Sequence, residues 1–144
     1  MTRPLPALVL GGLARLARRL TLALLAAVLT AALAATALTL AWLALDRGSA
    51  PGDAPYAWLG LFFVLLAFGS PAAVLFSLAV APLAARAGRA RPGWFFPVCA
   101  AGGGALVLLT TDLRFAVLGV LGGLGYAALE RRFTGRRAVR LERD

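Results

Sequence analysis

Four long apolar stretches without an Asp, Glu, Lys, Arg or His residue dominate this chain. They cover residues 20–45, 58–83, 94–111 and 115–129. A water-soluble protein of 144 residues that is 61% hydrophobic would have too little polar surface to cover its exterior. A bilayer core needs about 20 apolar residues per spanning helix. The pattern therefore predicts an all-α integral membrane four-helix bundle, built as a single domain with four transmembrane helices.

The arginines between these stretches alternate sides. Thirteen of the fifteen lie before the first stretch, between the second and third, or after the fourth, whereas the other two loops hold only Arg47 and Arg114. Because basic loops stay in the cytoplasm, both termini are predicted to be cytoplasmic. The residues expected to contact anionic lipid headgroups are Arg15, Arg18, Arg19, Arg86, Arg89, Arg91, Arg131 and Arg132.

The two ends of the chain are more polar than its middle. Residues 1–19 place leucines at helical spacing and three arginines on another side, with Gly11 and Gly12 between them. This pattern predicts a short amphipathic segment in the headgroup plane, and a docking surface for a partner is the alternative. Residues 130–144 are predicted to form a basic cytoplasmic tail.

The first apolar stretch also admits a second interpretation. Arginines, an apolar core and the triplets Ala32–Ala34 and Ala35–Ala37 are typical of a secretory signal with its cleavage site. The hydrophobic run continues past both triplets to Leu43, which favours a membrane helix. The last two stretches, joined by a tight reversal at Thr110–Asp112, are predicted to form a helical hairpin, with a re-entrant hairpin as the alternative.

Two prolines are predicted to kink the helices that contain them. Pro71 lies near the centre of the second stretch, and Pro97 lies in the third. Proline lacks a backbone N–H, and its ring clashes with the carbonyl four residues earlier. Ser70 or Ser77 is expected to satisfy the backbone groups freed in this way. We interpret both kinks as structural.

The fourth stretch carries small residues at helical spacing. Gly119, Gly123 and Ala127 are four residues apart, and Gly122 lies beside them, so these four positions predict a helix-packing face. Residues 123–128 also spell G-x-G-x-x-A, which is typical of dinucleotide-binding turns. That chemistry requires a preceding strand, which an apolar span does not supply.

The composition removes several kinds of chemistry. The chain has no histidine, and its only methionine is Met1, so imidazole and intramembrane thioether ligands are absent from the sequence. Cys99 has no charged neighbour in sequence and is interpreted as a small buried hydrophobe. We expect no catalytic, cofactor-binding or metal site. Despite a net charge of +9, we expect no nucleic-acid partner, because membrane topology accounts for the arginine clusters.

These observations predict a small polytopic membrane protein that is not an enzyme. It would act through helix packing as an accessory, assembly or scaffold component, with the bilayer and either another membrane protein or a second copy as partners. The alternative is an oligomeric small transporter or channel. Lysine, isoleucine, asparagine, glutamine and histidine do not occur, which indicates a GC-rich bacterial source and hence the bacterial inner (cytoplasmic) membrane.

Overall fold

The computed structural model describes residues 5–45, 51–110 and 113–141, and the regular elements in these ranges are all helical. In chain order the elements are α1 (Leu5–Leu45), α2 (Ala54–Leu75), a π-helical segment (Phe76–Val80), α3 (Ala81–Ala90), α4 (Phe95–Thr110) and α5 (Ala116–Leu141). Short 3-10 turns precede three of the helices, at Pro51–Asp53, Pro92–Trp94 and Leu113–Phe115. The predicted all-α class is confirmed for these residues.

Some sequence predictions fall outside the described residues. They concern residues 1–4 of the predicted interfacial segment, residues 46–50 of the first loop, Thr111 and Asp112 of the predicted reversal, and residues 142–144 of the tail.

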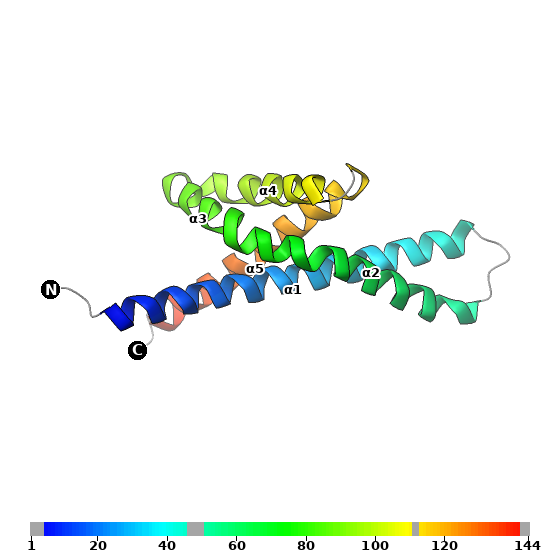
Figure 1. Cartoon of the computed structure of the whole chain (residues 1–144), viewed down its shortest axis with the longest axis horizontal. Helices are drawn as coiled ribbons and strands as arrows, with labels where there is room; N and C mark the ends of the chain where they lie inside the picture. Colours follow the sequence, from blue (N-terminus) through cyan, green and yellow to red (C-terminus); the bar gives the residue numbers. More distant parts are fainter. Residues whose placement is uncertain (1–4, 46–50, 111–112, 142–144) are drawn as a thin grey trace.

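The helices are arranged as two hairpins (Figure 1). Helices α1 and α2 run side by side, and α4 and α5 share the most extensive contact in the structure. Helix α5 also packs along α1, so the two termini lie at the same end of the molecule. Helix α3 crosses from α2 to α4. The α1–α2 hairpin extends well beyond the tip of the α4–α5 hairpin.

Two helices are longer than the sequence predicted. Helix α1 runs without interruption from Leu5, so the predicted boundary at Leu20 is no break in secondary structure. Pro6 lies in the first turn, where proline costs no helical hydrogen bond. Helix α5 continues past Leu129 to Leu141, so much of the predicted basic tail is helical.

Two helical rods are long and apolar enough to cross a membrane. They cover Leu10–Leu45 and Ala54–Ala90, with 36 and 37 residues. Only 28% and 17% of their most apolar windows is buried inside the protein, which separates them from the core helices of a soluble domain. The apolar part of helix α4 is shorter and covers Phe95–Leu109.

The second rod changes its hydrogen bonding just before Pro82. Pro82 cannot donate to the carbonyl four residues earlier, and its ring crowds that turn. The backbone widens there, and the N–H of Ala81 donates to the carbonyl of Phe76, five residues back. The buried hydroxyl of Ser77 donates to the carbonyl of Val74 at 2.8 Å. A π-turn next to a proline is a recognised way to absorb such a clash.

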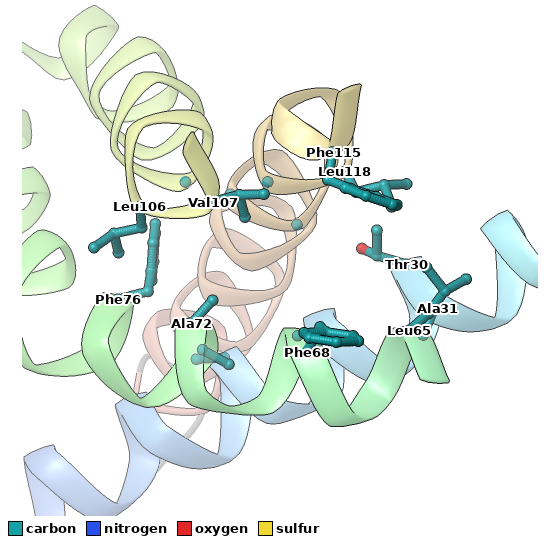
Figure 2. Close-up of a pocket in the computed structure, with 18 of the residues that line it drawn as sticks. Thr30, Ala31, Leu65, Phe68, Ala72, Phe76, Leu106, Val107, Phe115 and Leu118 are labelled. Carbon is teal, nitrogen blue, oxygen red and sulfur yellow. The ribbon is translucent and has the colours of Figure 1, made fainter. Parts of the chain in front are cut away.

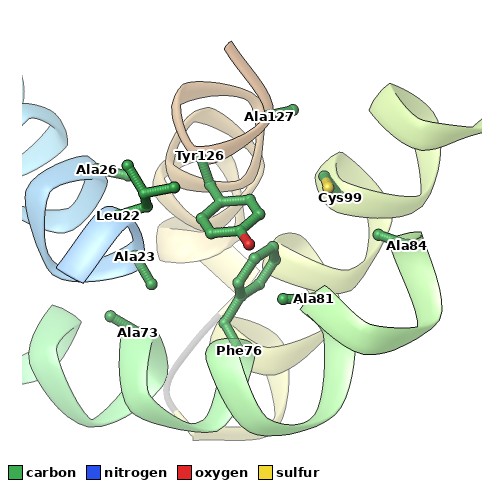
Figure 3. Packing of buried hydrophobic residues seen from close by; sticks show 10 residues of the cluster. All are labelled: Leu22, Ala23, Ala26, Ala73, Phe76, Ala81, Ala84, Cys99, Tyr126 and Ala127. Carbon is green, nitrogen blue, oxygen red and sulfur yellow. The ribbon is translucent and has the colours of Figure 1, made fainter. Parts of the chain in front are cut away.

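The core lies where α1, α2, α3, α4 and α5 meet (Figure 3). The rings of Phe76 and Tyr126 contact each other edge to face, with centroids 5.1 Å apart. Small side chains surround this pair, so the helices approach closely; the cluster comprises Leu22, Ala23, Ala26, Ala73, Phe76, Ala81, Ala84, Cys99, Tyr126 and Ala127. Cys99 is fully buried there, which confirms its interpretation as a small core residue.

Candidate functional site

The glycines of α5 lie directly against the backbone of α4. A methyl group added to Gly123 would collide with the carbonyl group of Cys99, and one added to Gly119 would collide with the carbonyl group of Gly103. Gly103 in turn leaves no room for a side chain, because the backbone of Gly119 occupies that space. We call this contact, formed by Cys99, Gly103, Gly119 and Gly123, the glycine seam. It brings two backbones together without intervening side chains.

The other two predicted face positions have different surroundings. Ala127 is fully buried in the core cluster, one turn beyond Gly123. Gly122 points elsewhere: an added methyl group would meet only the Thr30 hydroxyl oxygen of α1, at 3.8 Å. Gly122 therefore belongs to the side of α5 that faces α1.

The sequence did not identify the residues on the other side of the seam. In α4, Gly102 faces Val80, Gly103 faces α5, and Gly104 faces Val120. Successive residues of a helix are about 100° apart around its axis. Three consecutive glycines therefore point in three directions and do not predict a single packing face. In α1, Ala23, Ala31 and Ala35 are buried and Ala27 is half-buried, so the alanine repeat is a second packing face.

A cavity of about 200 Å³ lies between α1, α2, α4 and α5 (Figure 2). Buried small residues form its inner wall, among them Ala72, Gly119 and Gly123. Figure 2 shows Phe68 on the α2 side and Phe115 with Leu118 on the α5 side. Because Phe68 and Phe115 are exposed at 67% and 45%, this side of the cavity opens to the surface.

Hydroxyl groups along the rods are largely satisfied by their own helices. Those of Thr21, Thr30 and Thr36 donate to the carbonyl four residues earlier, at 2.8–3.0 Å. Such bonds leave the donor hydrogens unavailable to a ligand. Thr36 also accepts a hydrogen bond from the indole N–H of Trp58, at 3.0 Å, which ties α1 to α2.

The two predicted kink prolines lie at different positions within their helices. Helix α2 continues past Pro71 to Leu75, and the change in hydrogen bonding comes later, before Pro82. The hydroxyl of Ser70 donates to the carbonyl of Ala67 at 3.5 Å, and this is the carbonyl that Pro71 leaves without its helical donor. The predicted role of Ser70 is therefore confirmed.

Pro97 lies at the start of its helix. It is the third residue of α4 and so belongs to the first turn. The N–H groups of a first turn have no carbonyl partner inside the helix, so proline interrupts no hydrogen bond within α4 there.

The arginines expected at lipid headgroups come from three segments that are far apart in sequence. These are the first part of α1, the end of α3 and the later part of α5, and all three lie toward the same end of the molecule (Figure 1). The residues are Arg15, Arg18, Arg19, Arg86, Arg89, Arg91, Arg131 and Arg132, of which Arg18 and Arg19 are half-buried and the others exposed. Arg131 also lies over the ring of Phe96, 4.5 Å from its centroid.

Glu130 lies one turn beyond Tyr126 on α5, directly before Arg131, and is half-buried. The carboxylate of Glu130 is within electrostatic range of the Tyr126 hydroxyl and of the Cys99 thiol. Arg19 of α1 is within range of the same Tyr126 hydroxyl. Arg19 and Glu130 are more than 100 positions apart, so sequence spacing did not indicate that both lie near Tyr126.

Within the described ranges, no three His, Cys, Asp or Glu residues are grouped so that they could hold a metal ion. The candidate site consists of the glycine seam and the adjoining apolar cavity. Comparison of the chain with protein-family models, with curated proteins and with solved structures found no match.

Proposed function

We propose that this chain is a small integral membrane protein of the bacterial inner membrane that acts through helix packing, as an accessory, assembly or scaffold component. In this proposal four helices cross the bilayer and both termini are cytoplasmic. The observation that carries it is the separation of surfaces: the arginine-bearing segments gather at one end, and large apolar side chains are exposed along the rods. A bilayer is the solvent that suits both surfaces.

The exposed apolar side chains support contact with lipid. Leu33 of α1 is 72% exposed and Phe63 of α2 is 62% exposed, and they lie 14 residues after Arg19 and 23 residues before Arg86 along the chain. In water, exposed apolar area on this scale would drive aggregation, whereas in hydrocarbon it costs nothing. The length of both rods, at ~54 Å or more, is ample for a hydrocarbon core of ~30 Å.

The uncovered end of the α1–α2 hairpin supports a role in assembly. Beyond the tip of the α4–α5 hairpin these two helices have only each other as partners within the described residues (Figure 1). Leu40 and Leu59 are exposed on this part. In the proposed function another membrane protein or a second copy of the chain packs here.

Topology is tested by labelling single cysteines in intact cells, in a Cys99→Ala background. Gly52 lies just before the second rod, Ala90 is the last residue of that rod, and both are exposed. We expect an impermeant thiol reagent to label Gly52→Cys from outside and to leave Ala90→Cys unlabelled until the membrane is opened. The reverse pattern, or equal labelling of the two, would refute the proposed orientation.

The assembly role is tested by co-purification in mild detergent. The wild-type chain should isolate with a stoichiometric partner or as a defined oligomer, and Leu40→Ala with Leu59→Ala should release it. Val117→Ala is the matched control, because Val117 is exposed on α5 instead. A monomer free of partners in every sample would contradict the proposal.

An oligomeric transporter or channel is the competing function. Ion passage through hydrocarbon needs a path lined by polar groups, whereas the hydroxyls at the cavity wall belong only to Thr30 and Tyr126. We expect vesicles containing the purified protein to show no ion flux above empty vesicles. Selective flux that Gly103→Leu or Pro71→Ala abolishes would favour the channel over the scaffold.

A further inference from the structure

We propose that the cavity between α1, α2, α4 and α5 is a binding site for one acyl chain of a bilayer phospholipid. The chain would enter sideways, through the mouth formed by Val64, Phe68 and Phe115. This inference rests on the proposed membrane function and goes beyond it, because it assigns a ligand to a defined site.

The chemistry of the wall selects hydrocarbon over water or ions. No residue of the cavity wall carries a charge. Thr30 already donates its hydroxyl hydrogen to the carbonyl of Ala26 at 2.8 Å. A buried water needs two to four polar partners, and apolar cavities of ~150 Å³ stay dry and bind small hydrocarbons. At about 200 Å³ this cavity is large enough for part of an alkyl chain.

The mouth lies at the depth of acyl chains. Val64 and Phe68 are six and ten residues beyond Trp58 along α2, so they are ~9–15 Å farther from the aromatic end of that helix. Their exposed side chains continue the apolar outer face of α2, which also carries the exposed Val74 and Leu75. In the proposed membrane arrangement this face contacts lipid tails, so the mouth opens into hydrocarbon and is uncharged, like the chain it would admit.

Two glycines at the cavity leave space open. A methyl group on Gly69 would meet nothing within 4 Å, and one on Gly122 would meet only Thr30, at 3.8 Å. This is the opposite of Gly119 and Gly123, whose space another backbone fills. An unfilled void forfeits dispersion contacts along its wall, and an alkyl chain would restore them.

The site is tested by photolabelling from within the membrane. The full chain is reconstituted into phosphatidylcholine vesicles that contain a small share of phosphatidylcholine with a diazirine in the middle of one acyl chain. After irradiation, labelled residues are identified by mass spectrometry. Tyr126 is 1% exposed and lines the cavity, so a label there reports a chain inside it. Leu33, which is 72% exposed, reports ordinary lipid contact.

Three glycine-to-leucine variants isolate the cavity. Gly122→Leu and Gly69→Leu fill it from two different helices, and each should lower labelling of Tyr126 roughly ten-fold while leaving Leu33 unchanged. Gly60→Leu is the matched control. Gly60 also has nothing within 4 Å and belongs to α2, but it does not line the cavity. It should leave both labels as they are.

Each outcome separates this site from the underlying membrane function. Label at Leu33 without label at Tyr126 would overturn the acyl-chain site and leave the membrane placement standing. Label at neither residue would overturn both. Label at Tyr126 that survives both filling variants, or that comes instead from a water-soluble photoreagent, would overturn entry of a lipid chain into the cavity.

Discussion

The two hairpins of this molecule are held together by different kinds of contact. In the α4–α5 hairpin the glycine seam puts backbone against backbone. In the α1–α2 hairpin the identified cross-helix bond joins the side chains of Trp58 and Thr36, next to the alanine repeat of α1. Side chains can change rotamer when a neighbour grows, whereas a helical backbone cannot. The α4–α5 hairpin should therefore tolerate larger side chains at its helix contact far less well than the α1–α2 hairpin does.

The largest expected effect comes from filling the glycine seam. In Gly123→Leu the new Cβ would collide with the carbonyl group of Cys99, so α4 and α5 must separate. We expect a loss of ~3 kcal/mol or more in unfolding free energy, measured by denaturant titration in detergent with circular dichroism. Leu121→Ala, half exposed on the same helix, should change it by less than ~0.5 kcal/mol. Equal losses would refute the backbone contact.

A smaller effect distinguishes two neighbouring glycines of α5. Gly119→Ala places a methyl group against the carbonyl of Gly103 and should cost ~1–3 kcal/mol. Gly122→Ala meets only Thr30 at 3.8 Å, so the better helix propensity of alanine should stabilise the protein by up to ~1 kcal/mol. Thermal unfolding of the two variants side by side gives the comparison. If both variants changed the stability in the same direction, the close approach of the α4 backbone would not be confined to the Gly119 side of α5.

The cross-helix bond of the α1–α2 hairpin should be worth less than the seam. Trp58→Phe removes the donor to Thr36 but retains a ring that can stack on Phe62, as Trp58 does at 5.3 Å between centroids. We expect a loss of ~0.5–1.5 kcal/mol. Tyr56→Phe, on the same helix and 77% exposed, is the control and should be neutral. If Trp58→Phe lowers the unfolding free energy as much as Gly123→Leu does, the side-chain contact of the α1–α2 hairpin is as important for stability as the backbone contact of the α4–α5 hairpin.

The smallest expected effect is a gain in stability at Thr39 of α1. The hydroxyl of Thr39 is buried and has no hydrogen-bond partner in the described part of the chain. Thr39→Val keeps the shape and removes the unsatisfied group, so it should raise unfolding free energy by up to ~1 kcal/mol. Thr21→Val should not, because Thr21 is exposed and donates to the carbonyl of Ala17 at 3.0 Å. A lower unfolding free energy in Thr39→Val would show that this hydroxyl does have a hydrogen-bond partner.

Sequence alone predicted the elements that depend on local composition. The apolar stretches became helices, because apolar runs of this length have few other ways to satisfy their backbone. The spacing of Gly119 and Gly123 predicted a face that a backbone approaches, and both lie on the seam. Ser70 was predicted to satisfy a backbone group freed by a nearby proline, and it donates to the carbonyl that Pro71 leaves open.

The remaining features depend on three-dimensional packing. Helical spacing defines a face but not its partner, so Gly103 could not be assigned to the opposite side of the seam. The π-helical segment at Phe76–Val80 has no compositional marker other than Pro82, and a proline alone does not predict such a segment, since α2 continues as an α-helix past Pro71. The cavity cannot be predicted from sequence either, since it is the space that four helices leave between them.

The unequal length of the two hairpins gives the molecule no single hydrophobic thickness. Helix α4 has 16 residues, or ~24 Å, whereas the apolar rod of α1 in the other hairpin has 36, or ~54 Å. In the arrangement we propose, the bilayer around the α4–α5 side is thinned while the α1–α2 side fits a thick one. Such a change in bilayer thickness costs fractions of a kcal/mol per Å of hydrophobic mismatch. In that arrangement the protein would be favoured in regions where the bilayer changes thickness.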